Sequence, residues 1–415
     1  MSAGSVPRVP PTASATAGTG ENGFPRVVVE REVPGVVADD TRAAIFAEVL
    51  TAGPASRTEL ARRLGLSQST VTRAVNPLIE TGYLREIGAR ASEGGRPQRI
   101  LAVARDRHLV LGVKLAPQSV TAVLTDLEAT IVSRSRLPVA AGAEPEDVLT
   151  LAAQAAAFLL AADHRSADRL LGAGVGLGGH VDSRTGRCVR SGVLGWEDVD
   201  VAGPLSAKLG LPVVVNNDAN ALLVAERWFG AGRDSESLAV VTVGAGIGCG
   251  LLIGGGLYAG SGGLAGELGH VPVQPDGPPC SCGNRGCLES VAADPAILRA
   301  ISEASGVPCA SISEALARAA TGESAALEAF AVMGEALGRA LATLCNLVNP
   351  QKIVLTGESL RAYEYFGPAC RAAMAAHGFS TAAADCELVA HPADDDVWAR
   401  GAACLAIREA VQATR

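Results

Sequence analysis

The sequence predicts an α/β protein of two lobes with a cleft between them, preceded by a small winged helix-turn-helix domain. From Leu109 onward, short apolar strands alternate with helical stretches, which is typical of α/β lobes. Before that point, two short helical patterns flank Gly65, and a two-strand pattern follows them. Residues 41–100 also hold nine Arg against five Asp and Glu, whereas the 415-residue chain carries a net charge of −8. A basic module joined to an acidic body suggests a polyanionic partner for the module, although a solvated basic face has the same composition.

Residues 1–38 are rich in Ser, Thr, Ala, Gly and Pro, and we expect them to form a flexible tail without a fold. Hydrophobic residues make up 48 % of the chain, yet no apolar run reaches about 18 residues without a polar interruption, so we expect no membrane span. No leader pattern opens the chain, which predicts a cytoplasmic protein without a disulfide framework. We expect seven of the ten cysteines to be small core residues: Cys188, Cys249, Cys309, Cys345, Cys370, Cys386 and Cys404.

The winged helix-turn-helix domain is predicted at residues 39–104. Its first helix shows apolar residues at helical spacing, and Ser56 precedes a second helix. Ser67 is placed to cap a third helix that runs from Gln68 to about Glu80. A two-strand pattern around Gly94-Gly95 then predicts the wing.

The segment from Arg57 to Arg73 resembles bacterial winged-helix regulators of the MarR and ROK type. We expect two groups of DNA contacts: polar residues near the start of the third helix, for bases or phosphates, and arginines around it, for phosphates. The first group is Gln68, Ser69, Thr72 and Arg73, and the second is Arg57, Arg90, Arg96 and Arg99. Pro77 removes a hydrogen bond inside this helix, so we expect a bend there. A unit that binds another protein is the alternative interpretation of the same fold.

Residues 105–415 are predicted to form the two-lobed body. The expected strands are 109–113, 120–125, 131–137, 170–177, 213–215, 238–243, 250–253 and 353–355. Helices are expected at 145–164 and from 325 to about 348.

One imidazole and three thiols fall within the short stretch from Gly266 to Glu289, namely His270, Cys280, Cys282 and Cys287. Soft sulfur and nitrogen donors in this number match the ligands of a closed tetrahedral zinc site. The loop between them is rich in Pro and Gly, which disfavours the alternative of unrelated cysteines buried in a core element. Glu267 precedes His270 by three residues, so on a helical turn both side chains project from one face.

The body from Leu109 to the end resembles the ROK family, which contains repressors and sugar kinases with a two-lobed, actin-like fold. The resemblance rests on three segments: Val215 to Ala221, Gly266 to His270, and Cys280-x-Cys282 followed by Cys287-x-Glu289. It implies a structural Zn²⁺ held by His270, Cys280, Cys282 and Cys287, with no open position for metal catalysis. It also implies that sugar hydroxyls bind to Asn217, Asp218, Glu267, His270 and Glu289.

The sequence departs from the family's kinases in the nucleotide-binding loops. Their Asp-x-Gly-Gly-Thr phosphate loop is replaced by residues 112–119, where Lys114 stands for the Asp and both glycines are absent. Pro117 in this loop has no N–H to offer a phosphate. A second glycine-rich loop at 242–248 is intact, but the adenosine-side segment at 355–358 lacks the usual glycine pair.

Half a phosphate cradle is a poor basis for phosphoryl transfer, so we expect no ATP binding and no enzymatic activity. In the family's kinases the residue at Asp218 is the general base, and here we expect it to be vestigial. The sugar side departs as well, because Gly178-Gly179-His180 stands for a Pro-Gly pair and Val193 for an Asn. Trp196 is expected in the core.

These observations predict a DNA-binding transcriptional regulator of carbohydrate metabolism that senses a sugar or sugar phosphate. The resemblance implies a homodimer or homotetramer, which would read a pseudo-palindromic operator in double-stranded DNA. One alternative is an active ATP-dependent sugar kinase with an accessory helix-turn-helix. The other is a regulator that does not bind sugar and whose body serves for oligomerisation.

Overall fold

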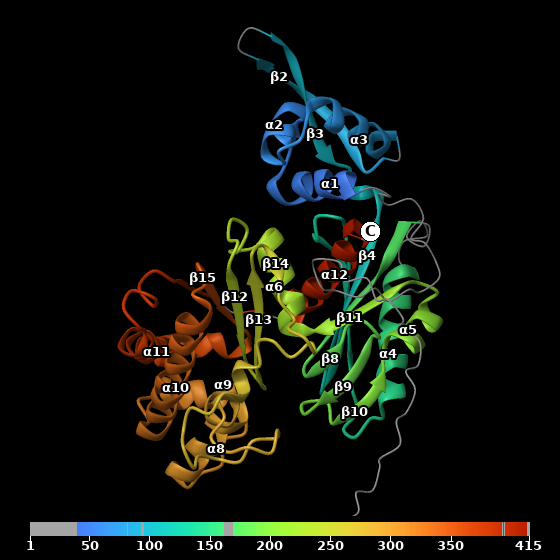
Figure 1. Cartoon of the computed structure of the whole chain (residues 1–415). Helices are drawn as coiled ribbons and strands as arrows, with labels where there is room; N and C mark the ends of the chain where they lie inside the picture. Colours follow the sequence, from blue (N-terminus) through green and yellow to red (C-terminus); the bar gives the residue numbers. More distant parts are fainter. Residues whose placement is uncertain are drawn as a thin grey trace, which may run out of the picture.

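The structure is a computed structural model that describes residues 40–80, 82–92, 95–161, 169–391, 393 and 395–412. The tail predicted at 1–38 lies outside the described residues. Figure 1 shows a small N-terminal domain above a larger body, in which two sheets lie apart from each other with helices α6 (Asp218–Phe229) and α12 (Asp395–Gln412) between them.

The N-terminal domain packs helices α1 to α3 on an antiparallel sheet in the order β1-β3-β2. Its elements are α1 (Asp40–Ala52), β1 (Ala55–Ser56), α2 (Arg57–Arg63), α3 (Gln68–Glu80), β2 (Leu84–Ser92) and β3 (Gly95–Val103). Ser56 begins α2 in a capping box with Glu59, and Ser67 Oγ accepts the Thr70 N–H at 3.1 Å at the start of α3. The predicted helix-turn-helix and wing are confirmed, and α3 continues through Pro77.

The first lobe is built on a mixed sheet in the order β11-β7-β4-β5-β6. Its strands are β4 (Leu109–Ala116), β5 (Ser119–Thr125), β6 (Ile131–Pro138), β7 (Leu170–Leu177) and β11 (Val213–Asn217). Helices α4 (Pro145–Ala161) and α5 (Ala202–Leu209) share a hydrophobic cluster with this sheet. A small antiparallel sheet, formed by β8 (His180–Asp182), β9 (Arg187–Ser191) and β10 (Trp196–Asp200), belongs to the same lobe.

The second lobe is built on a sheet in the order β14-β13-β12-β15-β16. Its strands are β12 (Leu238–Val243), β13 (Ile247–Ile253), β14 (Gly256–Leu257), β15 (Lys352–Thr356) and β16 (Glu387–Ala390). Its helices are α7 (Leu288–Ala292), α8 (Asp294–Ser305), α9 (Ile312–Ala320), α10 (Ser324–Val348) and α11 (Tyr363–His377). By length and composition α10 resembles a membrane-spanning helix, but Phe330, Met333 and Leu337 bury one of its faces in the core of this lobe.

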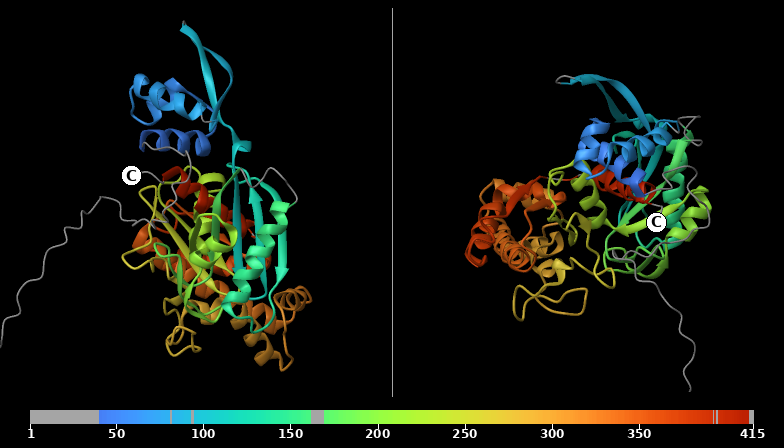
Figure 2. Two further views of the ribbon diagram at one scale, coloured as in Figure 1. Left: turned by 90° about the vertical axis from the view of Figure 1, so that its right-hand side faces the viewer. Right: turned by 45° about the horizontal axis from the view of Figure 1, so that its top comes forward.

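Helix α12 lies directly on the backbone of the first lobe's sheet. A Cβ added to Gly112 in β4 would collide with the carbonyl oxygen of Ala399, and one added to Gly174 in β7 would collide with that of Ala402. These glycines are needed because the helix axis approaches the strands so closely. The C-terminal half of α12 also shares a hydrophobic cluster with α1, and Figure 2 shows the N-terminal domain above this end of α12.

The connection between the N-terminal domain and the body is short. Strand β3 ends at Val103, a 3-10 turn η1 spans Arg105–Arg107, and β4 begins at Leu109. Across this junction the ring of Tyr83 stacks on that of His108, with centroids 4.8 Å apart. Only the short segment around η1 therefore separates the wing from the body.

All predicted body strands are present, most of them one to three residues longer than expected. The helix predicted at 145–164 begins as expected, and its predicted end falls in the undescribed residues 162–168. The seven cysteines expected in the core are buried, and Trp196 is 5 % exposed. The elements that were not predicted include the sheet β8–β10 and helices α6, α11 and α12.

Candidate functional site

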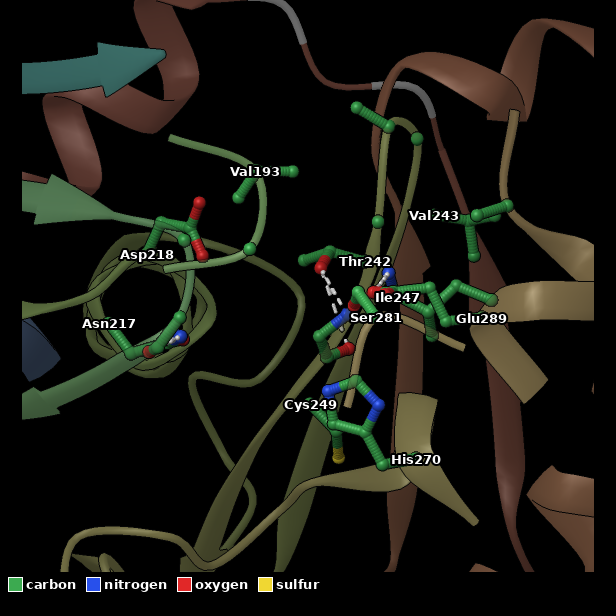
Figure 3. Close-up of a pocket in the computed structure, with 18 of the residues that line it drawn as sticks. Val193, Asn217, Asp218, Thr242, Val243, Ile247, Cys249, His270, Ser281 and Glu289 are labelled. Carbon is green, nitrogen blue, oxygen red and sulfur yellow. Dashed lines mark hydrogen bonds between the residues drawn. The ribbon is translucent and has the colours of Figure 1, made fainter. Parts of the chain in front are cut away.

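A cleft with a volume of about 460 Å³ lies between the two lobes. Figure 3 shows Asn217 and Asp218 on one wall, with Ile247 and Glu289 on the opposite wall. The first wall comes from the β4–β5 turn and the start of α6, and the second from the β12–β13 loop and α7. The structure brings together the five residues expected to contact a sugar, because all of them line this cleft: Asn217, Asp218, Glu267, His270 and Glu289.

Asn217 and Asp218 lie at the junction of β11 and α6. Asn217 Oδ1 accepts the Ala219 N–H at 2.9 Å, which caps α6, and its Nδ2 donates to the Gly179 carbonyl at 2.9 Å. The side chain of Asn217 thereby also holds the turn that follows β7. Asp218 is the first residue of α6, where the partial positive charge of the helix N-terminus favours a carboxylate.

Lys114 forms an ion pair with the carboxylate of Asp218. Its ammonium contacts Asp218 Oδ2, and the two side chains are only 12 % and 16 % exposed. The same ammonium lies 4.5 Å from the centroid of the Trp398 ring, on α12. A general base must accept a proton on one of its oxygens, and here a cation already lies at Oδ2.

The intact glycine-rich loop between β12 and β13 has carboxylates against it. Glu289 Oε2 accepts the Ile247 N–H at 3.0 Å. A Cβ on Gly244 would collide with the carboxylate of Glu358, at the start of the 3-10 turn η4 (Glu358–Ala362). Backbone N–H groups in such a loop favour phosphates, but two neighbouring carboxylates repel them.

The four predicted metal ligands converge beside the cleft. One ligand atom from each of His270, Cys280, Cys282 and Cys287 lies within 4.8 Å of the others. Cys282 Sγ and Cys287 Sγ are 3.7 Å apart, and Cys280 Sγ is 3.5 Å from His270 Nδ1. A tetrahedral zinc with Zn–S of about 2.3 Å and Zn–N of about 2.05 Å requires separations of about 3.8 and 3.6 Å. The donor set and these two separations therefore fit this metal.

Nδ1 of His270 faces this cluster. Its other ring nitrogen, Nε2, faces the carboxylate of Glu267 and lies 3.8 Å from Oε2. The shared face expected for the two side chains is confirmed, on a 3-10 turn η3 (Leu268–His270). Burial raises the pKa of Glu267, whereas His270 and His180 act to lower it. A carboxyl whose charged form is poorly solvated gains from hydroxyl donors in the cleft.

The residues expected to contact DNA lie on the N-terminal domain. Gln68, Ser69, Thr72 and Arg73 are exposed on the first turns of α3, as their position in the helix predicts. Three of the four arginines expected at phosphates are engaged within the domain: Arg57 Nη1 donates to Glu86 Oε1 at 3.1 Å, Arg99 also contacts Glu86, and Arg90 pairs with Glu59 at 3.0 Å. The side chain of Arg96 is outside the described side chains.

Trp398 and Glu358 line the cleft but were not identified as site residues from the sequence. Trp398 belongs to a helix that has no clear apolar period, because α12 is covered by the sheet on one side and by α6 on another. Glu358 was noted only as part of a segment without its glycine pair. The signal that could have identified Glu358 is an acidic residue where the family usually has a glycine, beside a phosphate loop.

Comparison with known proteins agrees with this architecture. The ROK family profile matches residues 110–409, and a winged helix-turn-helix DNA-binding profile matches residues 39–85. The xylose repressor of Bacillus subtilis is 30 % identical over 77 % of this chain and 82 % of its own length. The Escherichia coli DNA-binding transcriptional dual regulator NagC is 32 % identical over 79 % of this chain and 82 % of its own length.

Two solved structures extend the comparison. A ROK family transcriptional regulator, a homologue of the E. coli MLC protein, covers 90 % of this chain and 96 % of its own, with a TM-score of 0.78 and 26 % identity. A ROK family glucokinase from Streptomyces griseus, in complex with glucose and AMPPNP, covers 72 % of this chain and 98 % of its own, with a TM-score of 0.62 and 26 % identity. With its family profile spanning most of the chain and a winged helix-turn-helix in front of it, the protein belongs to the ROK family.

Proposed function

We propose that this protein is a sequence-specific, DNA-binding transcriptional regulator of carbohydrate metabolism whose body senses a sugar or sugar phosphate. The observation that carries the proposal is that one chain holds both an exposed polar recognition helix and a polar cleft. Helices α1 and α12, which lie between the two, pack in one hydrophobic cluster. A ligand in the cleft is thus connected to the DNA-binding domain by packed structure. The similarity to a xylose repressor and to NagC supports the same function.

In this proposal the cleft recognises a sugar through directional hydrogen bonds. Asp218, Glu267 and Glu289 accept from hydroxyl groups, while Asn217 and His270 complete the set. A buried polar group without its partner is costly, so the cleft discriminates against sugars that lack a matching hydroxyl.

We assign Zn²⁺ to His270, Cys280, Cys282 and Cys287. Three thiolates and one imidazole saturate a tetrahedral ion, so its role is structural. It holds the loop between Gly266 and Glu289 and fixes the ring of His270 through Nδ1. The other ring nitrogen then faces Glu267, an arrangement common around zinc-bound histidines.

We infer that the body is not a kinase. Lys114 lies at the oxygen of Asp218 that would take a proton, Pro117 removes a donor from the first loop, and Glu358 lies against the second loop. These three residues act on different parts of phosphoryl transfer, namely the base and the two phosphate loops. The active sugar kinase is therefore the second candidate.

The DNA partner is a double-stranded operator, bound by α3 in the major groove with Arg57 and Arg96 at phosphates. The protein acts in the cytoplasm as a homodimer or homotetramer, because a two-fold assembly matches a pseudo-palindromic operator.

The test begins with selection of a DNA duplex from a random library by the full-length protein, followed by footprinting. The Kd for this duplex is then measured with and without xylose, glucose, N-acetylglucosamine and glucose 6-phosphate. We expect a defined footprint and a shift in Kd of about 5- to 150-fold with one of these sugars. Binding to all sequences alike, lost as salt rises, would contradict specific regulation.

A coupled ATPase assay on the same sugars tests the kinase alternative. We expect no turnover with the wild-type protein. Turnover that disappears in Asp218→Asn would establish a kinase and overturn the sensor. A specific footprint that no sugar changes would instead favour the regulator that does not bind sugar.

A further inference from the structure

We propose that Lys114 and Trp398 are positioning residues that pass the state of the sugar cleft to the DNA-binding domain, with α12 as the connecting element. This inference rests on the proposed function and adds its mechanism of regulation. Lys114 lies in β4 and Trp398 in α12, so neither residue belongs to the DNA-binding domain.

The first step is a contact inside the cleft. The Lys114 ammonium lies between the carboxylate of Asp218 and the face of the Trp398 ring, and Trp398 is 5 % exposed. Electrostatic attraction is stronger at such low exposure than in water, both for the ion pair and for the cation over the ring. The position of the ammonium is therefore determined by Asp218 and Trp398 together.

The second step is competition for Asp218. One of its oxygens accepts the Ala219 N–H at 2.9 Å, and the other contacts Lys114. A sugar hydroxyl that donates to Oδ2 shares this oxygen with the ammonium or displaces the ammonium from it. Either event shifts the ammonium relative to the Trp398 ring, so sugar binding changes a contact of α12.

The third step is transmission along α12. The helix touches the backbone of β4 at Gly112 and that of β7 at Gly174, through the carbonyl oxygens of Ala399 and Ala402. Close packing of this kind deforms little, so the helix responds as a unit. From Trp398 to Ala410 it extends about 18 Å at 1.5 Å per residue.

The last step is the contact with the DNA-binding domain. Ile407 and Ala410 of α12 belong to one hydrophobic cluster with Ile45 and Val49 of α1, and Val75 of the recognition helix α3 belongs to it too. Figure 1 shows α1 directly above this end of α12. A displacement of α12 thus changes the orientation of the recognition helix relative to the body.

The test uses the full-length variants Trp398→Leu and Lys114→Met. The Kd for the library-selected duplex is measured with and without one sugar. This is the member of the panel of xylose, glucose, N-acetylglucosamine and glucose 6-phosphate that shifts the operator Kd of the wild-type protein. Each variant's Kd for that sugar is measured calorimetrically. The duplex is then titrated at a sugar concentration that saturates that variant. The matched control is Trp196→Leu, because Trp196 is also 5 % exposed but packs in the first lobe away from α12.

We expect the sugar-induced shift in operator Kd to shrink by about 2- to 30-fold in Trp398→Leu and Lys114→Met, and to remain in Trp196→Leu. A merely structural role would weaken both Kd values without changing their ratio. An unchanged ratio in both variants, or an equal loss in Trp196→Leu, would overturn the inference. If the wild-type protein selects no duplex or responds to no sugar, the proposed function itself fails, and this inference with it.

A fluorescence measurement keeps the inference testable if Trp398→Leu does not fold. The chain has three Trp, so in a Trp196→Phe/Trp228→Phe variant the emission comes from Trp398 alone. We expect a saturating concentration of the same sugar to change this emission, and Lys114→Met in this background to remove the change. Emission that the sugar leaves unaltered would refute the role of Trp398.

Discussion

Replacement of Cys282 by Ser is expected to remove most of the zinc affinity of the chain. The separations of 3.7 Å between Cys282 Sγ and Cys287 Sγ and of 3.5 Å between Cys280 Sγ and His270 Nδ1 match a tetrahedral ion within about 0.1 Å. Structural zinc sites contribute about 10 to 16 kcal/mol, hence about 2.5 to 4 kcal/mol for each of four ligands. At 1.4 kcal/mol per tenfold, loss of one ligand weakens binding by about two to three orders of magnitude.

The assay combines the zinc content of the purified protein by mass spectrometry with competition against a coloured chelator and a thermal melt. Cys309→Ser is the matched control, because Cys309 is a buried thiol of the same lobe outside the cluster. We expect one zinc per chain in the wild type and the control, and a lower melting temperature for Cys282→Ser. A wild-type protein without zinc, or a Cys282→Ser protein with unchanged affinity and melting, would refute the reasoning.

Three further predictions follow from other parts of the molecule. Arg73→Ala is expected to weaken operator binding by about 1 to 3 kcal/mol in a gel-shift titration, whereas the exposed Arg339→Ala of α10 leaves it unchanged; equal affinities for all proteins would exclude Arg73 as a contact. Gly112→Ala is expected to lower the free energy of unfolding by about 1 to 3 kcal/mol or more in urea, because its Cβ meets the Ala399 carbonyl, whereas Gly262→Ala has open space; similar midpoints would contradict the close packing of α12. Burial lowers the pKa of His108, so the unfolded chain binds a proton at higher pH than the folded protein, and stability falls as the pH drops through about 6.5. The melting temperature should therefore fall more between pH 7.5 and 5.5 in the wild type than in His108→Phe, and parallel falls would exclude this contribution.

The parts of the fold that were predictable are those specified by local patterns. Helix caps at Ser56 and Ser67 and an apolar stripe define the helix-turn-helix within about 30 residues, because each signal acts within one turn. The metal ligands were predictable for a similar reason, since His270 and Cys287 are close in sequence and their chemistry is distinctive.

The role of Lys114 was not predictable in the same way. Its replacement of an Asp indicated a lost phosphate loop, but its partner Asp218 is 104 positions further along the chain, and Trp398 comes from the last helix. Helix α12 itself escaped prediction because it is covered on more than one side, so its small apolar residues show no helical period. Contacts that depend on the meeting of distant elements require the structure.

The junction between Val103 and Leu109 is short, and the rings of Tyr83 and His108 stack across it. This junction bears on the spacing of the DNA sites that the protein binds. In the proposed two-fold assembly, the distance between the two recognition helices depends on how the bodies assemble, because the junction is short. Operator half-sites then have to lie at a fixed rotational phase, and insertion of about 5 bp, half of a helical turn, turns one of them to the opposite face of the duplex. For the proposed two-fold assembly, regulatory sites would then be recognisable in a genome by a constant spacer length as well as by their bases.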